Sequence, residues 1–450
     1  MNSKYSSFSR DQLLERIREL ESQLTGNLNN EEIPEKEHKN KKKRKTVTEK
    51  RPFDMSKYTK RKIALRVAYL GWNYCGYASQ NRPEEIPTIE DMLFKALTNC
   101  RLVENIEASD YSRCGRTDKG VSGLGQVIAL QVRSKKLQSD PTPGLLPADQ
   151  EYAYVDTLNR MLPPDIRVLA WAPVEDDFSA RFHCTGRTYK YFFARNKLQI
   201  DKMQQACRYF EGHHDFRNFC KMDPSKNVLS YERHIISMTI DPVEYTQTSG
   251  ISEGSEFYQV TLKGTAFLWH QVRFMMSVLF LIGQGFEAPE VICDLLDIEK
   301  VPSKPDFPMA SDLPLVLYDC EFKNLQWTHS FRDSVYDPLP SSYRTYLHYN
   351  EEWTVQMIRS LTCQYYFTKV GGFPVMMPDQ TIKTVRDFTE QRGVTSPDGV
   401  ATIVLGGGKE TRLNKYKLLL DRPRCDTDQM KKEKFEVRQK RKMDRMESDV

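Results

Sequence analysis

The spacing of apolar residues along the chain predicts several β-strands. Ile63, Leu65, Val67 and Tyr69 alternate with smaller or polar residues, which is typical of a half-buried strand. Residues 126–132 form a nearly continuous apolar run, which predicts a buried strand. We expect further strands at residues 187–195, 257–262 and 316–318.

Helical periodicity appears between these strands. Residues 88–91, Thr-Ile-Glu-Asp, predict a capped helix that runs to about Leu97. Residues 270–282 are apolar nearly all round and predict a buried helix, and residues 353–361 predict an amphipathic one. Strands and helices in this order indicate an α+β fold with a mixed or antiparallel sheet.

The N-terminal region has a different pattern. Leu13, Ile17, Leu20 and Leu24 alternate in steps of four and three, so residues 11–24 predict a helix with a short coiled-coil seam. Two heptads are compatible with a weak dimer contact or with an isolated amphipathic helix. Residues 25–60 are polar without apolar periodicity and are predicted to be disordered, which places the start of the folded core near Lys62.

These patterns separate a folded core from two extensions. Residues 1–61 form a basic N-terminal extension with the heptad helix, 62–335 the core, and 336–450 a C-terminal extension with a basic tail. Within the extension, residues 335–422 are either an elaboration packed on the core or an RNA-contacting segment.

Charge is distributed unevenly. The net charge is +5, but residues 34–62 hold 13 Lys/Arg against four Asp/Glu, and residues 431–450 hold eight against five. Nucleic-acid binding would therefore use a localised cleft or the tails. The run from Lys41 to Lys45 is compatible with a nuclear import signal, a phosphate contact or a solubilising segment.

Composition favours a protein of the nucleus or cytoplasm. The apolar content of 39% allows a substantial core, but no apolar run is long enough to span a membrane. Residues 1–10 are polar and lack the apolar region of a signal peptide. The ten cysteines form no Cys-x-x-Cys pair and are expected to be free thiols.

Two further motifs look like ligand-binding sites but lack the required spacing. His213 and His214 are adjacent, so on an extended segment they point to opposite faces and we expect no metal site. Residues 406–409, Gly-Gly-Gly-Lys, lack the spacing of a phosphate-binding loop and predict a flexible turn. We therefore expect neither a metal nor a nucleotide cofactor.

The strongest candidate for chemistry is the loop at residues 114–121, Cys-Gly-Arg-Thr-Asp-Lys-Gly-Val. It places Asp118 between Arg116 and Lys119. Neighbouring cations keep a carboxylate ionised, and an ionised carboxylate can act as a nucleophile or a base. The same residues are also ordinary turn chemistry before a strand.

The run from Arg113 to Ser122 resembles the signature of the TruA family of tRNA pseudouridine synthases, in which the aspartate of Gly-Arg-Thr-Asp is catalytic. Other segments that resemble this family occur in the expected order, and the resemblance covers roughly residues 62–325. These segments are residues 69–80, 181–193, 212–219, 264–276 and 308–318.

The resemblance implies a pseudouridine synthase fold, with a central sheet and a basic cleft. It implies two related α+β halves, a first catalytic half at residues 62–200 that carries Asp118 and a second at residues 201–335 that carries Arg273. It implies that Asp118 is the nucleophile, that Arg116 displaces the target base, that Tyr189 stacks on this base, and that Arg273 pairs with Asp118. Residues implied to contact the substrate are Tyr189, Tyr191, Arg187, Arg113, Lys119 and Gln80.

The implied function is isomerisation of uridine to pseudouridine in tRNA without a cofactor. The resemblance is greatest to the eukaryotic branch that modifies positions 38 and 39 of the anticodon stem-loop. The alternatives are a sister synthase acting at other tRNA or mRNA positions, and a non-enzymatic RNA-binding protein of the same fold. A homodimer is plausible from the heptads and from the habit of the family.

Overall fold

The computed structural model describes residues 53–80, 86–226, 228–244, 256–329, 341–385, 387 and 401–448. The chain divides into two compact units, Met1–Phe53 and Asp54–Val450, and the account below concerns the second. The predicted heptad helix and the run from Lys41 to Lys45 lie outside the described residues.

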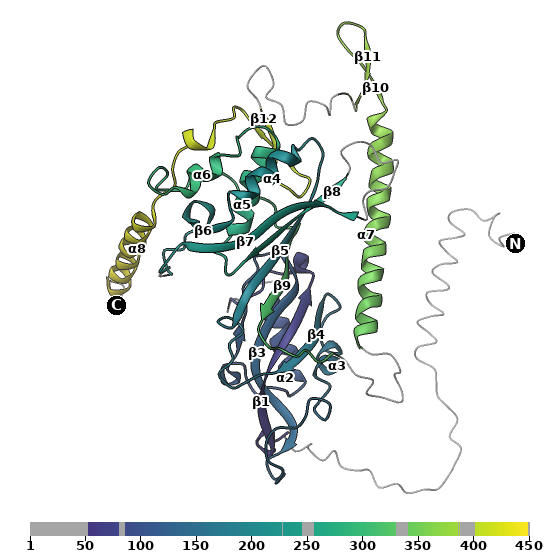
Figure 1. Ribbon diagram of the computed structural model, residues 1–450, viewed down its shortest axis with the longest axis vertical. Helices are drawn as coiled ribbons and strands as arrows, with labels where there is room; N and C mark the ends of the chain where they lie inside the picture. The colour runs from purple at the N-terminus through teal and green to yellow at the C-terminus, as the bar shows by residue number, and fades with distance from the viewer. Residues whose placement is uncertain are drawn as a thin grey trace, which may run out of the picture. The chain divides into compact units, whose positions relative to one another are not determined.

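One large mixed sheet organises the fold (Figure 1). Its strands are ordered β4-β1-β3-β9-β5-β8-β7-β6, with β2 attached to β3. All pairings are antiparallel except that of β3 with β9, which confirms the predicted mixed sheet. The bounds are β1 Tyr58–Tyr69, β2 Ser112–Arg113, β3 Ser122–Leu137, β4 Ile166–Pro173, β5 Cys184–Ala194, β6 Gly212–Asp215, β7 Glu232–Pro242, β8 Phe257–Gly264 and β9 Leu315–Phe322.

Strand β1 corrects two predictions. It begins at Tyr58, inside the segment predicted to be disordered, because Tyr58 and Lys60 already pair with β3. The buried Arg61 that follows has a partner, since its Nη1 lies 3.2 Å from Glu151 Oε1. It is also buried on both faces rather than half-buried. Ile63 belongs to a core shared with helices, whereas Ala64 belongs to a second core.

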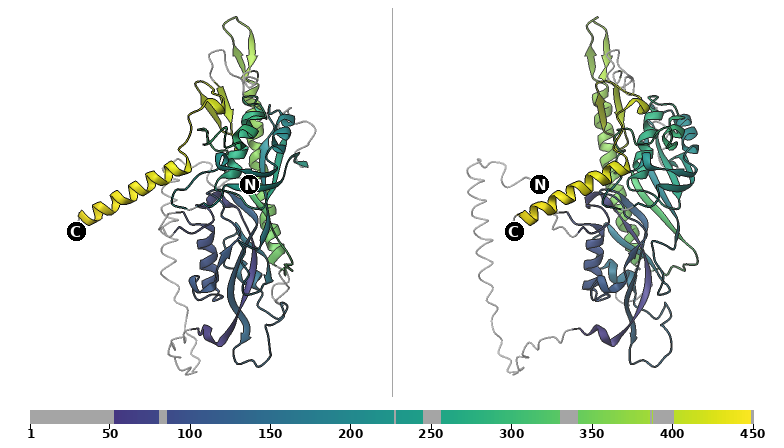
Figure 2. Two further views of the ribbon diagram at one scale, coloured as in Figure 1. Left: turned by 60° about the vertical axis from the view of Figure 1, so that its left-hand side comes forward. Right: turned by 90° about the vertical axis from the view of Figure 1, so that its left-hand side faces the viewer.

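Helices cover one face of each half. In the first half, α2 (Ile89–Asn99) and α3 (Tyr154–Asn159) share a core with β1, β3 and β4, and Figure 2 shows α2 beside these strands. The predicted cap of α2 is confirmed, because Thr88 and Asp91 form a reciprocal capping box. In the second half, α4 (Ile200–Arg208), α5 (Gln271–Gly283) and α6 (Val291–Leu296) share another core with β5, β7 and β8.

Helix α5 confirms the prediction of a buried helix at residues 270–282, since almost all of its side chains are inaccessible to solvent. Strand β9 lies between the two halves. It pairs with β3 through Val316 and Leu317 and with β5 along most of its length. This pairing gives one continuous sheet, while the division at residue 200 stays a prediction.

The C-terminal extension contains a long helix, two hairpins and a basic helix. Helix α7 (Ser341–Gly371) includes the predicted helix at 353–361 and exposes Trp353, Ile358 and Leu361, so this stretch is not packed on the core. The hairpins are β10–β11 (Pro374–Met376, Ile382–Thr384) and β12–β13 (Ala401–Val404, Glu410–Leu413), and the last helix is α8 (Asp428–Ser448). No described helix has the length and apolar character of a membrane span.

Residues 406–408 form the turn between β12 and β13, and all three glycines have positive φ. The turn that we predicted at this position is thus confirmed. The turn packs against β5 and against the segment before β9. A Cβ on Gly406 would lie 2.2 Å from the hydroxyl of Tyr191, and Ser311 N donates to Leu405 O at 2.8 Å. The hairpin therefore supports the segment that leads into β9.

Gly71 yields a stability prediction, because a Cβ there would lie 2.0 Å from the carbonyl oxygen of Val121. We expect Gly71→Ala to lower the free energy of unfolding by about 2–3 kcal/mol, because backbone must move to make room. Gly115→Ala is the control, since no heavy atom lies within 4 Å of its added Cβ, and it should change stability by less than about 0.5 kcal/mol. Urea unfolding measures both, and equal losses would contradict the packing argument.

Candidate active site

A cavity of about 1080 Å³ opens where the two halves meet at the sheet. Both halves contribute to its wall, which also includes Leu315, the first residue of β9. Of the residues predicted from the sequence, those that line it are Gln80, Arg113, Arg116, Asp118, Lys119, Arg187, Tyr189 and Arg273. Segments more than 150 residues apart in the sequence are thus brought to one site.

The loop that carries Asp118 is held in place by contacts with the glycine- and aromatic-rich segment 69–80. Tyr77 N donates to Thr117 O at 3.1 Å, and the hydroxyls of Tyr69 and Thr117 lie 2.9 Å apart. Gly76, at φ 87°, lets the backbone approach this loop closely. Short backbone contacts of this kind hold the position of the Asp118 carboxylate.

The contacts of Asp118 differ from the sequence prediction. Its Oδ1 lies 3.4 Å from Nε2 of His270, and its side chain is 21% exposed. Arg273, predicted to pair with Asp118, instead donates from Nε to Ala310 O at 2.9 Å and lies 3.8 Å from Asp312. No ion pair joins these two described residues, because Asp312, which the sequence prediction did not include, is the nearer carboxylate.

Tyr189 and Tyr191 lie on the same face of β5 but have different surroundings. Tyr189 lines the cavity and packs edge-on against Phe267, with ring centroids 5.0 Å apart. Burial raises the pKa of the Tyr189 hydroxyl well above its ordinary value, so it stays neutral at pH 7. Tyr191 is 1% exposed, does not line the cavity and donates to Ser311 O, so its predicted contact with substrate is not supported by its position.

Arg187 connects three segments of the wall. Its guanidinium donates to the carbonyl oxygens of Cys114, Arg181 and Thr265. The carbonyl of Cys114 belongs to the loop of Asp118, so Arg187 joins β5 to this loop. These hydrogen bonds give Arg187 a structural role, and its side chain also lines the cavity.

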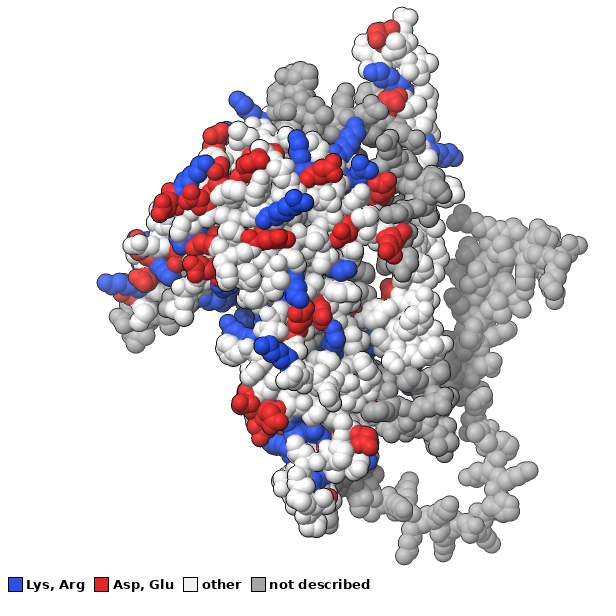
Figure 3. Space-filling view, in the orientation of Figure 1, with Lys and Arg blue, Asp and Glu red and all other residues white. Residues whose placement is uncertain are grey.

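The cavity wall contains eight lysine or arginine residues and a single acidic residue, Asp118. Burial, and then the charge of Arg113, lowers the pKa of the Arg116 guanidinium. Cations crowded in this way favour an anionic ligand. In contrast, Figure 3 shows Lys/Arg interspersed with Asp/Glu on the face that it displays.

Glu90 is the buried carboxylate beneath this wall. It is 1% exposed, and it accepts hydrogen bonds from Arg113, from the Tyr111 hydroxyl at 2.6 Å and from Ser79 N at 2.9 Å. These contacts fix both Arg113 and the end of the segment 69–80. Sequence analysis treated Glu90 only as part of a helix cap, because its partners lie on other segments.

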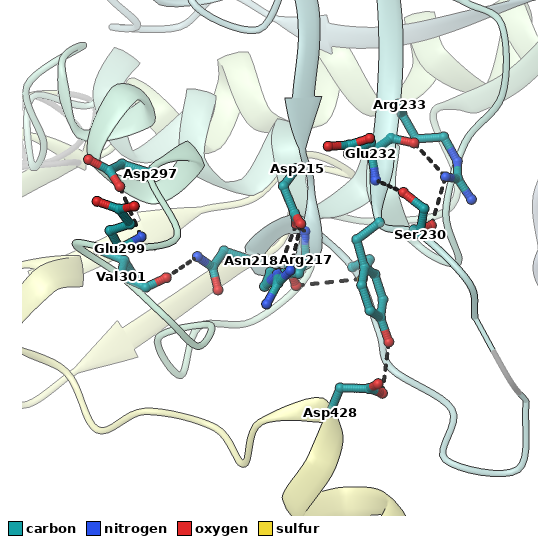
Figure 4. A network of polar contacts seen from close by, with 12 residues as sticks. Asp215, Arg217, Asn218, Ser230, Glu232, Arg233, Asp297, Glu299, Val301 and Asp428 are labelled. Atoms are coloured by element: carbon teal, nitrogen blue, oxygen red, sulfur yellow. Dashed lines mark hydrogen bonds and ion pairs between the residues drawn. The ribbon is translucent and has the colours of Figure 1, made fainter.

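A second polar network lies next to strand β7 (Figure 4). Arg217 forms an ion pair of 2.7 Å with Asp215 and lies over the ring of Tyr231, whose hydroxyl donates to Asp428 at the start of α8. The network therefore joins the start of α8 to the segment that leads into β7. Arg233, two residues beyond Tyr231, lines the cavity and donates to the carbonyl oxygens of Ser230 and Glu232.

Comparisons with known proteins agree with this arrangement. A family model described as tRNA pseudouridine synthase matches residues 206–323. The tRNA pseudouridine(38/39) synthase of Homo sapiens is 42% identical over 424 residues, covering 92% of this chain and 85% of that protein. The chain belongs to the tRNA pseudouridine synthase family. It is an isomerase that converts uridine to pseudouridine.

Two further comparisons differ in how similar they are to this chain. The tRNA pseudouridine(38/39) synthase of Saccharomyces cerevisiae is 45% identical over 343 residues, which is 72% of this chain and 73% of that protein. A crystal structure of a Cbf5–Nop10–Gar1 complex aligns with a TM-score of 0.21 and 14% identity over 50% of this chain and 45% of that chain.

Three cysteines of this synthase form the one group with metal-ligand spacing in the described ranges. The sulfur atoms of Cys114, Cys184 and Cys320 lie within 4.8 Å of one another. They sit among apolar side chains, including Phe178 and Leu317, where cysteine behaves as a small apolar residue. The three thiols supply one ligand fewer than the four of a structural zinc site.

Sequence reasoning missed other residues of the synthase's cavity: His270, Phe182 and Trp269. Phe182 is 79% exposed beside Arg181, and the ring of Trp269 lies under Lys221 and Lys226. The sequence shows only that Phe182 and Trp269 each stand next to a residue that can carry a positive charge. That their rings are exposed, and so could stack on a base, is visible only in the structure.

The ion pair of Glu90 with Arg113 yields a prediction about stability. Glu90→Gln removes the charge opposite Arg113 but keeps the side-chain shape, and we expect the free energy of unfolding to fall by about 1–3 kcal/mol, because Arg113 is partly exposed. The same substitution at Glu256, which pairs with Arg195 at the surface, should cost less than about 0.5 kcal/mol. Chemical unfolding compares the two variants, and a larger loss for Glu256→Gln would refute the assignment.

Proposed function

We propose that this protein isomerises uridines at positions 38 and 39 of the tRNA anticodon stem-loop. The observation that carries the proposal is the cavity in which Asp118 is the single acidic residue among eight basic ones. The similarity to relatives named for these two positions supports the choice of substrate. A duplex hides its bases, so the target uridine has to leave the stack to reach Asp118.

In this proposal Asp118 is the nucleophile, and it attacks the uridine at the base or at the ribose. The N1–C1′ bond breaks, the uracil turns within the cavity, and C5 bonds to C1′. The C5 proton is lost and N1 takes up a proton, so the reaction is redox-neutral. It needs neither a metal nor a nucleotide cofactor.

The other residues bind and orient the RNA. Arg116 displaces the base and holds the phosphate backbone, together with Arg113 and Lys119. Tyr189 stacks on the uracil as a neutral ring, a role for which its partly buried position beside Phe267 is suited. Arg273 has to exchange Asp312 for Asp118 or for a phosphate when RNA binds, because Asp312 is its carboxylate partner in the empty site.

The basic tails are proposed to add affinity that does not depend on sequence. Residues 55–62 belong to the fold, so the removable basic segment ends before Asp54. Deleting residues 34–50 should weaken binding to all tRNAs alike and flatten its dependence on salt. Binding that is indifferent to the deletion would reject this role.

We also propose that the protein is located in the nucleus or the cytoplasm. Imaging of a fluorescent fusion tests this location, and a fusion that is excluded from both compartments would contradict it.

A homodimer is proposed as well. Helix α7 exposes large apolar side chains along its length, and exposed apolar surface of this kind favours association. The side chains are Tyr346, Trp353, Ile358, Tyr365, Tyr366 and Phe367. Light scattering of the full chain, with and without residues 1–30, separates the roles of α7 and the heptads. A monomer in both cases would remove the idea.

Mapping of pseudouridine in tRNA treated with the purified enzyme tests the proposed function. The expected result is new pseudouridine at positions 38 and 39 and at no other uridine. Pseudouridine elsewhere in tRNA or in mRNA would identify a sister synthase. Binding of tRNA without any pseudouridine would favour the non-enzymatic alternative.

Phe182 yields a prediction about RNA binding. Stacking of a nucleobase on an aromatic side chain contributes about 1–3 kcal/mol, so Phe182→Ala should raise the dissociation constant for tRNA by about tenfold. Stability should hardly change, because the ring is 79% exposed. Phe257→Ala is the matched control, since Phe257 is also exposed but does not line the cavity. Equal affinities of the two variants would exclude a stacking role.

A further inference from the structure

His270 faces the Asp118 carboxylate, and no function has been assigned to it above. Its Nε2 lies 3.4 Å from Asp118 Oδ1, and its side chain is 10% exposed. This distance is slightly longer than an ordinary N–H···O hydrogen bond. Catalytic contacts are often long in empty sites and shorten in the substrate complex.

The backbone of His270 is unusual. It adopts φ 61° and ψ 9°, the left-handed conformation, at the N-cap of α5. A residue other than glycine rarely adopts this conformation, because its Cβ comes too close to the following carbonyl oxygen. The chain tolerates this conformation at a position where the imidazole reaches the candidate nucleophile. Backbone strain at such a position indicates a role for the side chain.

The surroundings select one tautomer of the imidazole. Nδ1 of His270 is buried and has no hydrogen-bond partner. A proton on Nδ1 would be a buried, unpaired donor, and the lone pair on Nε2 would then face the Asp118 carboxylate. With the proton on Nε2, the ring donates to Oδ1 and only Nδ1 stays unpaired, as an acceptor. In this tautomer the imidazole presents an N–H donor to Asp118.

No other described side chain occupies this position. Arg273 is held by Asp312 and by the carbonyl of Ala310.

We propose that His270 is a positioning residue that orients the Asp118 carboxylate for attack by donating a hydrogen bond from Nε2. The inference rests on the proposed role of Asp118 as the nucleophile. It assigns His270 no contact with the uridine. It predicts that the chemical step depends on the donor at this place, whereas tRNA binding does not.

The test compares His270→Gln with His270→Met in the full chain. The two side chains have the same length and neither is glycine, so both variants carry the same backbone cost. Only glutamine retains an N–H donor near the position of Nε2. The measurements are the single-turnover rate of pseudouridine formation with saturating enzyme, the dissociation constant for tRNA and the stability in urea.

We expect His270→Met to slow the single-turnover rate by about 10- to 100-fold, the effect of losing a hydrogen bond to a charged group. His270→Gln should stay within about fivefold of the wild type, and both variants should bind tRNA within about twofold of it. Equal rates for the two variants, whether slow or fast, would overturn the proposal. Asp118→Ala serves as a separate control: residual turnover in that variant would reject the nucleophile itself, whatever happens at residue 270.

Discussion

The structure depends on the close approach of two loops, residues 69–80 and residues 114–121. Gly71 and Gly76 leave no room for a side chain against the backbone from Thr117 to Val121. The first loop is itself fixed by β1, whose two faces are both buried. Asp118 is therefore placed by the packing of backbone, which deforms little. Long side chains could not fix a carboxylate as firmly, because they lose more freedom on ordering.

Different segments contribute different parts of the chemistry. The loop at residues 114–121 supplies the carboxylate and the cations that flank it, whereas β5 supplies Tyr189 and the start of α5 supplies His270 and Arg273. Strand β9 pairs with both β3 and β5, so the two halves share one sheet at the cavity. The segment before β9 also carries Asp312, the partner of Arg273. Changes in this segment therefore reach the site through one ion pair.

Local patterns predicted the elements well where a local cause determines them. The cap at Thr88, the buried helix α5 and the turn at residues 406–408 each follow from a few adjacent residues. The sequence did not reveal that β1 is buried on both faces, because Ala64 is covered by residues such as Leu317 that lie far along the chain. The ion pair of Arg273 with Asp312 was not foreseen for the same reason, since Asp312 is 39 residues away.

The candidate site shows the same division. Motif resemblance located Asp118, Tyr189 and Arg187 at one cavity, but it could not reveal the left-handed backbone of His270 or the burial of Glu90. Both depend on tertiary contacts. Resemblance also placed Tyr191 at the substrate, although its hydroxyl lies against the hairpin β12–β13. Because side chains alternate along a strand, Tyr189 and Tyr191 lie on one face of β5, but how deeply each is buried depends on the residues packed against it.

The most direct test of the central claim is the release of tritium from tRNA labelled at uridine C5, measured for the wild type and for Asp118→Ala. The claim that Asp118 performs the chemistry in this cavity predicts release by the wild type and none by the variant, with tRNA binding retained by both. Release at an undiminished rate by Asp118→Ala would contradict it.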